Sequence, residues 1–187
     1  MGRCRAPRGA RRRHTRRCDL SAPDITLRRL STGADDVALG QALVREYVVA
    51  TAAEQAGPDG DPDVERILSY IPDWDDFAGR FLHSGGAFVV ADVASDVAGC
   101  VGVTPLGDGV CEMNRLWVRP AFRRFGLGRA LAVASMDTAR ELGFTRMLLD
   151  VLPQRVGAIA LYLELGFVEV PPSHEYAFPM VFLGRDL

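Results

Sequence analysis

A short run of arginines and glycines, RRFGLGRA at residues 123–130, has the composition of an anion-binding loop. It lies where a strand-like run gives way to a helix-like run, so a helix should begin near Gly126. The first turn of a helix leaves backbone N–H groups without acceptors, and the peptide dipole makes that end positive. Glycines at 126 and 128 let a ligand approach the backbone, and Arg123, Arg124 and Arg129 add charge. The loop therefore predicts binding of a polyphosphate.

Three kinds of phosphate-binding loop compete for this stretch. A nucleoside-triphosphate P-loop ends in Gly-Lys-Ser/Thr, and the chain contains no lysine. A dinucleotide-binding fingerprint needs a third glycine where this chain has Leu131, although Asp150 follows about one βα unit later. The third pattern is Arg-x-x-Gly-x-Gly, which residues 123–128 match.

This third loop, preceded by EMNRLWVRP and followed by ALYLELGF, resembles the acyl-CoA-binding core of the GNAT superfamily of N-acetyltransferases. The likeness runs in the same order from about residue 86 to residue 167. It implies an α/β GNAT fold, acetyl-CoA as co-substrate, and a primary amine that attacks it directly in a ternary complex. A non-catalytic acyl-CoA sensor on the same fold is the alternative, and a turnover assay would separate the two.

The resemblance also implies which residues hold the cofactor. In the family, backbone amides of the loop and the helix start, here residues 124–129, bind the pyrophosphate of CoA, and the strand before the loop pairs with the pantetheine arm. Arg155 stands where many members have an asparagine that contacts the cofactor, and its charge could serve a phosphate instead. The expected cofactor-binding residues are Leu116, Trp117, Val118, Arg123, Arg124, Phe125, Gly126, Leu127, Gly128, Arg129 and Arg155.

Two further residues stand where the family carries its chemistry. Acetyl transfer needs a neutral amine, yet a lysine-like amine has a pKa of about 10.4 and is protonated at neutral pH, so a general base helps. Glu112 lies on the strand feeding the loop, where several members place a glutamate base. Tyr162, in ALYLELGF, has the usual position of the acid that protonates the departing thiolate. A structural carboxylate and a packed aromatic ring are the alternative interpretations of these two residues.

The rest of the chain must supply the elements that position these residues. Glycine and aspartate tolerate positive φ, so the turn at residues 107–109 predicts a hairpin. The order of elements predicts a mixed sheet flanked by about four helices, and the resemblance implies antiparallel N-terminal strands and a parallel, splayed pair around the CoA-binding helix. The expected order is strand 25–30, helix 37–55, a helical stretch 64–82 that Pro72 divides, three strands within 85–118, helix 126–144, strand 146–152, helix 156–167, and short strands 168–170 and 180–183.

The N-terminal segment differs from the rest of the chain in charge. Residues 1–17 hold eight arginines and no acid, whereas the remainder holds 14 arginines and 24 acids, a net charge of −10. No apolar run of a secretory signal follows. We expect residues 1–22 to be a disordered tail or the product of a start codon placed too far upstream, and residues 23–187 to form a single domain. Within the chain, only this basic tail is expected to bind nucleic acid.

Cysteine spacing and hydropathy narrow the class of protein. The four cysteines show no Cys-x-x-Cys or Cys-x-x-His spacing, so neither a zinc site nor a disulfide framework is expected. No apolar stretch reaches the ~18 residues that cross a bilayer. We expect a cytoplasmic protein without metal or membrane anchor, acting as a monomer or homodimer.

Overall fold

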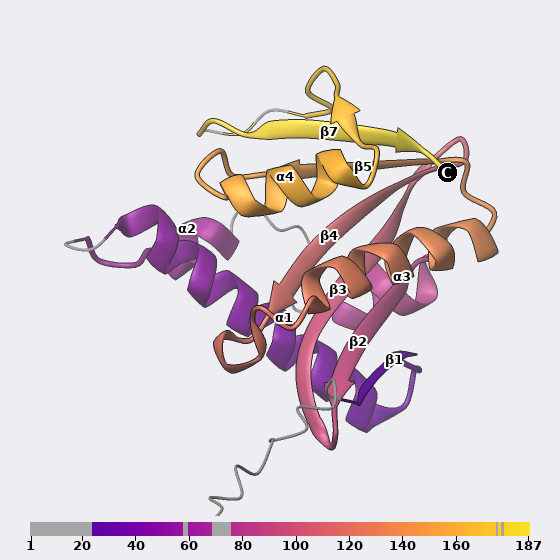
Figure 1. The fold of residues 1–187 in the computed structure, drawn as a ribbon. Coiled ribbons are helices and arrows are strands. Elements are labelled where there is room, and N and C mark those ends of the chain that lie inside the picture. The colour runs from indigo at the N-terminus through magenta and orange to yellow at the C-terminus, as the bar shows by residue number, and fades with distance from the viewer. Residues whose placement is uncertain (1–23, 58–59, 69–75, 175, 177) are drawn as a thin grey trace, which may run out of the picture.

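The structure, a computed structural model, describes residues 24–57, 60–68, 76–174, 176 and 178–187, so the basic tail at residues 1–22 lies outside it. Figure 1 shows the fold, whose element order confirms the one expected from the sequence. The elements are β1 (Ile25–Arg29), α1 (Ala34–Ala56), α2 (Val64–Leu68), a π-helical turn η1 (Ala78–His83), β2 (Ala87–Val93), β3 (Asp96–Gly107), β4 (Val110–Val118), a 3-10 turn η2 (Pro120–Phe122), α3 (Leu127–Glu141), β5 (Arg146–Val151), α4 (Val156–Glu164), β6 (Val168–Glu169) and β7 (Val181–Asp186).

Strands β1 to β4 form an antiparallel meander, as expected. The turn between β3 and β4 places Asp108 at φ 49° and Gly109 at φ 75°, the left-handed conformation that these two residue types tolerate. Pro105 consequently pairs with Cys111. The complete sheet has seven strands in the order β1-β2-β3-β4-β5-β7-β6, and β4 and β5 are its parallel pair.

The parallel strands β4 and β5 stay paired over a short distance only. Residues 110–112 of β4 pair with residues 146–148 of β5, and beyond these the two strands separate, as Figure 1 shows for the ends that carry their arrowheads. Within β4, Arg115 has φ 54° and the register against β3 shifts between Cys100 and Gly102. Such a bulge bends a strand and changes where its side chains point. The bulge and the separation confirm the splayed pair and open a gap in the sheet.

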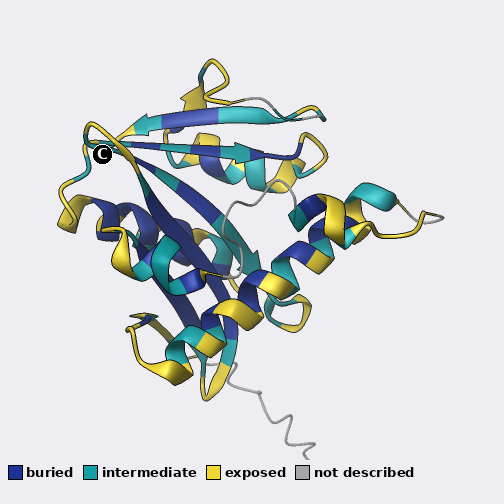
Figure 2. Ribbon diagram, turned by 180° about the vertical axis from the view of Figure 1, so that it is seen from behind, coloured by how far each residue is buried: buried dark blue, intermediate teal, exposed yellow. Residues whose placement is uncertain are grey.

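Helices cover both faces of the sheet. On one face α3 and α4 bury residues such as Leu131, Met136 and Tyr162 against the strands. On the other face α1 and η1 pack apolar residues, among them Leu43 and Phe81, onto β2 and β3. Figure 2 shows α1 with its buried residues toward the sheet and exposed ones outward. Truncating a fully buried leucine costs about 2–5 kcal/mol, so these faces fix the helices that carry the site.

Two further expectations concern the cysteines and the membrane. Cys100 and Cys111 are buried free thiols. Burial raises the pKa of the Cys111 thiol to about 12, with the charge of Glu112 adding to the effect, so this sulfur is not an activated nucleophile. Within the part of the chain that the structure describes, no helix combines the length and apolar character needed to span a bilayer.

Candidate active site

The helix α3 begins at a glycine in a conformation that other residues rarely adopt. Gly126 has φ 77° and forms the N-cap of α3 without a side-chain cap, and Arg124 just before it has φ 71°. The first helical hydrogen bond runs from the Ala130 N–H to the Gly126 carbonyl at 3.1 Å. The first-turn amides before Ala130 therefore stand at a helix N-terminus that is ready to bind an anion.

A groove of 860 Å³ extends from the start of α3 to the start of α4. Every expected cofactor-binding residue lines it except Phe125, whose side chain is 53% exposed. Gly128 leaves room in this wall, because a Cβ added there would meet only Leu161 at 3.8 Å. The groove is lined by Glu54, Leu116, Trp117, Val118, Phe122, Arg123, Arg124, Gly126, Leu127, Gly128, Arg129, Gln154, Arg155, Val156, Gly157, Ala158 and Leu161.

The arginines of the loop differ in their contacts. Arg123 lies over the Trp117 ring, 5.0 Å from its centroid, and its Nε donates to the Val118 carbonyl at 3.1 Å. Arg129 forms an exposed ion pair with Glu164. Exposed ion pairs contribute little to stability, so the Arg129 guanidinium can be drawn to a phosphate at little cost.

Arg155 is engaged at the start of α4, where it is the N-cap residue. Its guanidinium pairs with Glu54 at 2.8 Å and donates to Thr51 Oγ1 at 2.9 Å and to Tyr47 Oη at 3.3 Å. These three partners belong to α1. Arg155 therefore links α4 to α1 while it lines the groove. Binding of a phosphate by Arg155 stays a prediction.

Tyr162 projects from α4 into the gap between the splayed strands. The gap is also lined by Leu116 of β4 and Asp150 of β5. The ring is 6% exposed and packs edge-on against Phe167, with centroids 5.9 Å apart. Burial raises the pKa of the phenol, and the neighbouring Tyr47 adds to the effect. The hydroxyl is consequently protonated at neutral pH, the state in which it can donate a proton.

Glu112 lies on β4 and lines a different cavity from Tyr162. Its carboxylate accepts a hydrogen bond from Asn114 Nδ2 at 3.1 Å, and Asn114 also donates to Thr104 Oγ1 at 2.8 Å. Glu112 lines a cavity with Thr104 and Arg80, whereas Tyr162 lines the gap described above. The two residues expected to be base and acid thus face neighbouring cavities.

Asp150 is the carboxylate that shares the gap with Tyr162, and it also lines the adjoining cavity under α1. It accepts a hydrogen bond from Tyr176 Oη at 2.9 Å. Burial raises the pKa of Asp150, and the nearby charge of Glu112 adds to the effect. In the sequence, Asp150 stands out only through its position about one βα unit after the loop, within the dinucleotide-binding interpretation. The signal for it was an acid near the end of the apolar run RMLLDVL, beyond the residues that pair with β4.

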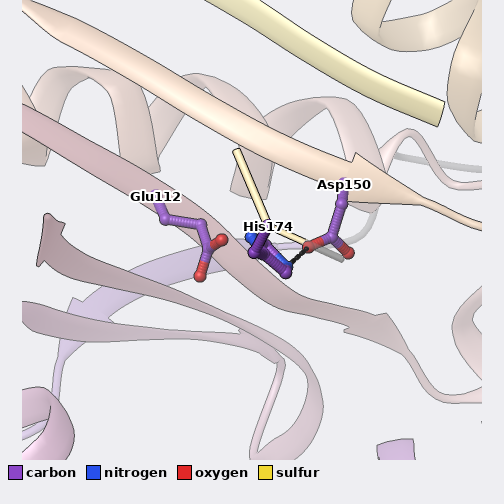
Figure 3. A group of neighbouring side chains, drawn as sticks. All are labelled: Glu112, Asp150 and His174. Atoms are coloured by element: carbon purple, nitrogen blue, oxygen red, sulfur yellow. Dashed lines mark ion pairs between the residues drawn. The ribbon is translucent and has the colours of Figure 1, made fainter. Parts of the chain in front are cut away.

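Glu112, Asp150 and His174 come together at the edge of this site (Figure 3). One potential ligand atom from each lies within 4.8 Å of those of the other two. They belong to β4, β5 and the connection between β6 and β7. The His174 ring packs edge-on against Tyr176 and Phe182, and its Nε2 lies 3.5 Å from Asp150 Oδ2. The spacing of these three residues along the chain does not indicate that they form a group.

Sequence comparison relates the chain to acetyltransferases. The model of the acetyltransferase (GNAT) family matches residues 41–167. The chain is 34% identical over 102 residues to the uncharacterized N-acetyltransferase YjgM of Escherichia coli and 37% identical over 102 residues to one of Schizosaccharomyces pombe. The matches cover 53% and 54% of this chain and 61% and 63% of those relatives. The chain thus spans less than two thirds of the curated relatives it matches.

Solved structures show the same fold. An acetyltransferase of the GNAT family from Staphylococcus aureus superposes with a TM-score of 0.67 at 18% identity, covering 87% of this chain and 99% of that one. YncA of Salmonella typhimurium, solved with acetyl-CoA, superposes with a TM-score of 0.59 at 23% identity, covering 87% and 94%. Together with the family match over residues 41–167, these likenesses lead to one conclusion: the chain belongs to the GNAT family of acetyltransferases.

Proposed function

We propose that the protein transfers an acetyl group from acetyl-CoA to a primary amine by direct attack in a ternary complex. The observation that carries this proposal is the groove of 860 Å³ that runs from the uncapped start of α3 to Leu116, Arg155 and Ala158, which also line the gap between β4 and β5. One end of the groove suits phosphates, and the gap that adjoins its other end holds Asp150 and Tyr162, which are able to move protons. A thioester at the gap supplies the activated acetyl group, so the enzyme needs no nucleophile of its own.

The charge and the volume of the groove support the proposal that it binds CoA. Helix N-terminal amides stabilise a pyrophosphate through aligned N–H groups and the positive end of the dipole. Gly128 leaves space for a phosphate to approach the backbone of the first turn, and the arginines before and after it add charge. On the other wall, Leu116 and Val118 follow the β4 bulge and pack partly buried on the α3 face. We infer that the backbone of this segment pairs with the pantetheine arm.

Two carboxylates are candidates for the base that takes the amine proton. Glu112 is the candidate that the resemblance implies, and it lines the neighbouring cavity. Asp150 lines the gap itself, and burial, with the charge of Glu112 in addition, raises its pKa. We infer that Asp150 accepts the proton as the nitrogen–carbon bond forms, and that Glu112 acts on Asp150 through its charge.

Tyr162 is the candidate acid at the other end of the reaction. As the carbon–sulfur bond breaks, the departing thiolate needs a proton, and the buried phenol can donate one if it lies within hydrogen-bond reach. Tyr162 lines the same gap as Leu116 and Asp150, which supports this role. The tyrosinate then recovers its proton from solvent after the products leave.

Isothermal titration with acetyl-CoA tests the first half of the proposal. We expect saturable binding to the full chain, and absence of binding at millimolar acetyl-CoA would end the proposal. A thiol-release screen over primary amines, peptides and aminoglycosides tests the second half. Binding of acetyl-CoA without thiol release in the presence of any acceptor would favour the acyl-CoA sensor instead. Nucleic acid binding by the basic tail stays a prediction, as does the monomeric or homodimeric state.

A further inference from the structure

We propose that Glu112, Asp150 and His174 form a binding site for a divalent metal ion of the zinc class. The three side chains converge from two splayed strands and a connecting segment (Figure 3). One donor atom of each lies within 4.8 Å of the other two. Together they offer two carboxylate oxygens and one imidazole nitrogen, a donor set of the kind that holds zinc with an open fourth position.

The distances suit a shared ion better than direct contacts. Zinc binds oxygen and nitrogen at about 2.0–2.2 Å, so two ligands of a tetrahedral ion lie about 3.4 Å apart. His174 Nε2 and Asp150 Oδ2 are 3.5 Å apart, which is longer than a good hydrogen bond and close to this separation. Glu112 completes the triangle after a shift of about 1.4 Å at most, which rotation of its side chain can provide.

Each of the three side chains is also held by a second contact. Tyr176 Oη donates to Asp150 Oδ2 at 2.9 Å, and Asn114 Nδ2 donates to Glu112 Oε2 at 3.1 Å. Ser173 Oγ lies 3.0 Å from Nδ1 of the imidazole, so the opposite nitrogen, Nε2, is the one that faces Asp150. Metal ligands are oriented by outer contacts of this kind.

Arg115 lines the same cavities as Asp150, and its charge partly offsets the rise that burial causes in the pKa of that carboxyl, but little positive charge is in direct contact with the group. Among the residues that the structure describes, no arginine forms an ion pair with Glu112 or Asp150, and His174 is the ion-pair partner of Asp150. Two partly buried carboxylates this close repel each other unless a cation or a proton lies between them. A divalent ion neutralises both charges, and the cavities lined by Asp150 give it a path of entry.

The imidazole decides which class of ion fits. Magnesium and calcium prefer oxygen ligands alone, whereas zinc and its neighbours in the first transition row accept nitrogen and oxygen together. A bound ion would occupy both candidate bases of the proposed acetyl transfer. Zinc should therefore inhibit acetylation by competing with the amine rather than with acetyl-CoA, an expectation that rests on the proposed function.

Titration of the full chain with zinc chloride tests the site without any turnover. The variant His174→Ala removes one ligand, and His83→Ala removes an exposed histidine at the end of η1 as a matched control. We expect wild type and His83→Ala to bind equally and His174→Ala to bind at least about tenfold more weakly, the loss of about 1.4 kcal/mol. The N-terminal residues Cys4, Cys18 and His14 are the same in all three proteins, so the difference isolates the site.

Equal zinc affinity in wild type and His174→Ala would overturn the proposal, as would magnesium chloride binding as tightly as zinc. Thermal melting of His174→Ala confirms that it is folded, and Asp150→Asn provides an independent loss of a ligand if the first variant does not fold. Cobalt(II) in place of zinc gives a visible spectrum that reports nitrogen and oxygen ligation. Because none of these readouts requires acetyl-CoA, failure of the metal site and failure of the proposed function are distinguishable.

Discussion

The substitution Gly128→Ala should change the stability of α3 and the affinity for acetyl-CoA in opposite directions. Gly128 lies in the first turn of α3, and an added Cβ would meet only Leu161, at 3.8 Å. The methyl group therefore fits the folded protein. Alanine is favoured over glycine in a helix by about 0.5–1 kcal/mol, which corresponds to a rise in melting temperature of about 1–4 °C for a chain of this size.

The same methyl group should weaken acetyl-CoA binding, because Gly128 forms part of the groove wall. Loss of one hydrogen bond between a backbone N–H and a phosphate costs about 1.5–3 kcal/mol, which raises the dissociation constant roughly 10- to 150-fold. Isothermal titration and thermal melting measure the two effects. Gly33→Ala, at the start of α1 and away from the groove, is the control for adding a methyl group at a helix start.

Stability and affinity should thus move in opposite directions in Gly128→Ala. A variant that melts higher and binds acetyl-CoA with wild-type affinity would refute the assignment of the phosphates to the start of α3. A variant that loses both would show that the glycine is needed for the fold, which its open surroundings contradict. Unchanged affinity in Gly33→Ala makes the comparison specific to the groove.

Three further outcomes follow from the site. Tyr162→Phe should lower turnover by about 10²–10⁴-fold with the acetyl-CoA dissociation constant unchanged, as titration and thiol release will show. Asp150→Asn should lower turnover more than Glu112→Gln does, yet raise the melting temperature, because it removes a charge disfavoured by burial; the reverse ranking would restore Glu112 as the base. Arg155→Met should lower the free energy of unfolding by about 1–3 kcal/mol, since it leaves Glu54 unpaired, and a large loss of acetyl-CoA affinity at unchanged stability would instead make Arg155 a phosphate ligand.

The fold could be predicted because its signals are local. Apolar periodicity, glycine turns and the spacing from Arg123 to Gly128 act over a few residues, and the structure has the expected elements in the expected order. The helical stretch expected at residues 64–82, divided at Pro72, corresponds to α2 and η1, and the expected break lies within residues 69–75, outside the described range.

The site was harder to predict, because it depends on contacts between distant parts of the chain. Arg155 reaches α1 across about a hundred residues, and Asp150 contacts Tyr176 and His174 of the β6–β7 connection, which lies next to β5 because β7 pairs with it. The β4 bulge at Arg115 requires a positive φ at a residue type that rarely adopts one. A single sequence shows which residue types could make such contacts, but it does not show which of these residues lie close together in space.

The most direct test of the account is an acetyl-CoA thiol-release assay with a panel of amines, run on wild type, Tyr162→Phe and Asp150→Asn at equal acetyl-CoA saturation. The account predicts amine-dependent release by wild type and a large loss in both variants while they still bind acetyl-CoA. Equal release by all three proteins, or release that no amine accelerates, would contradict it.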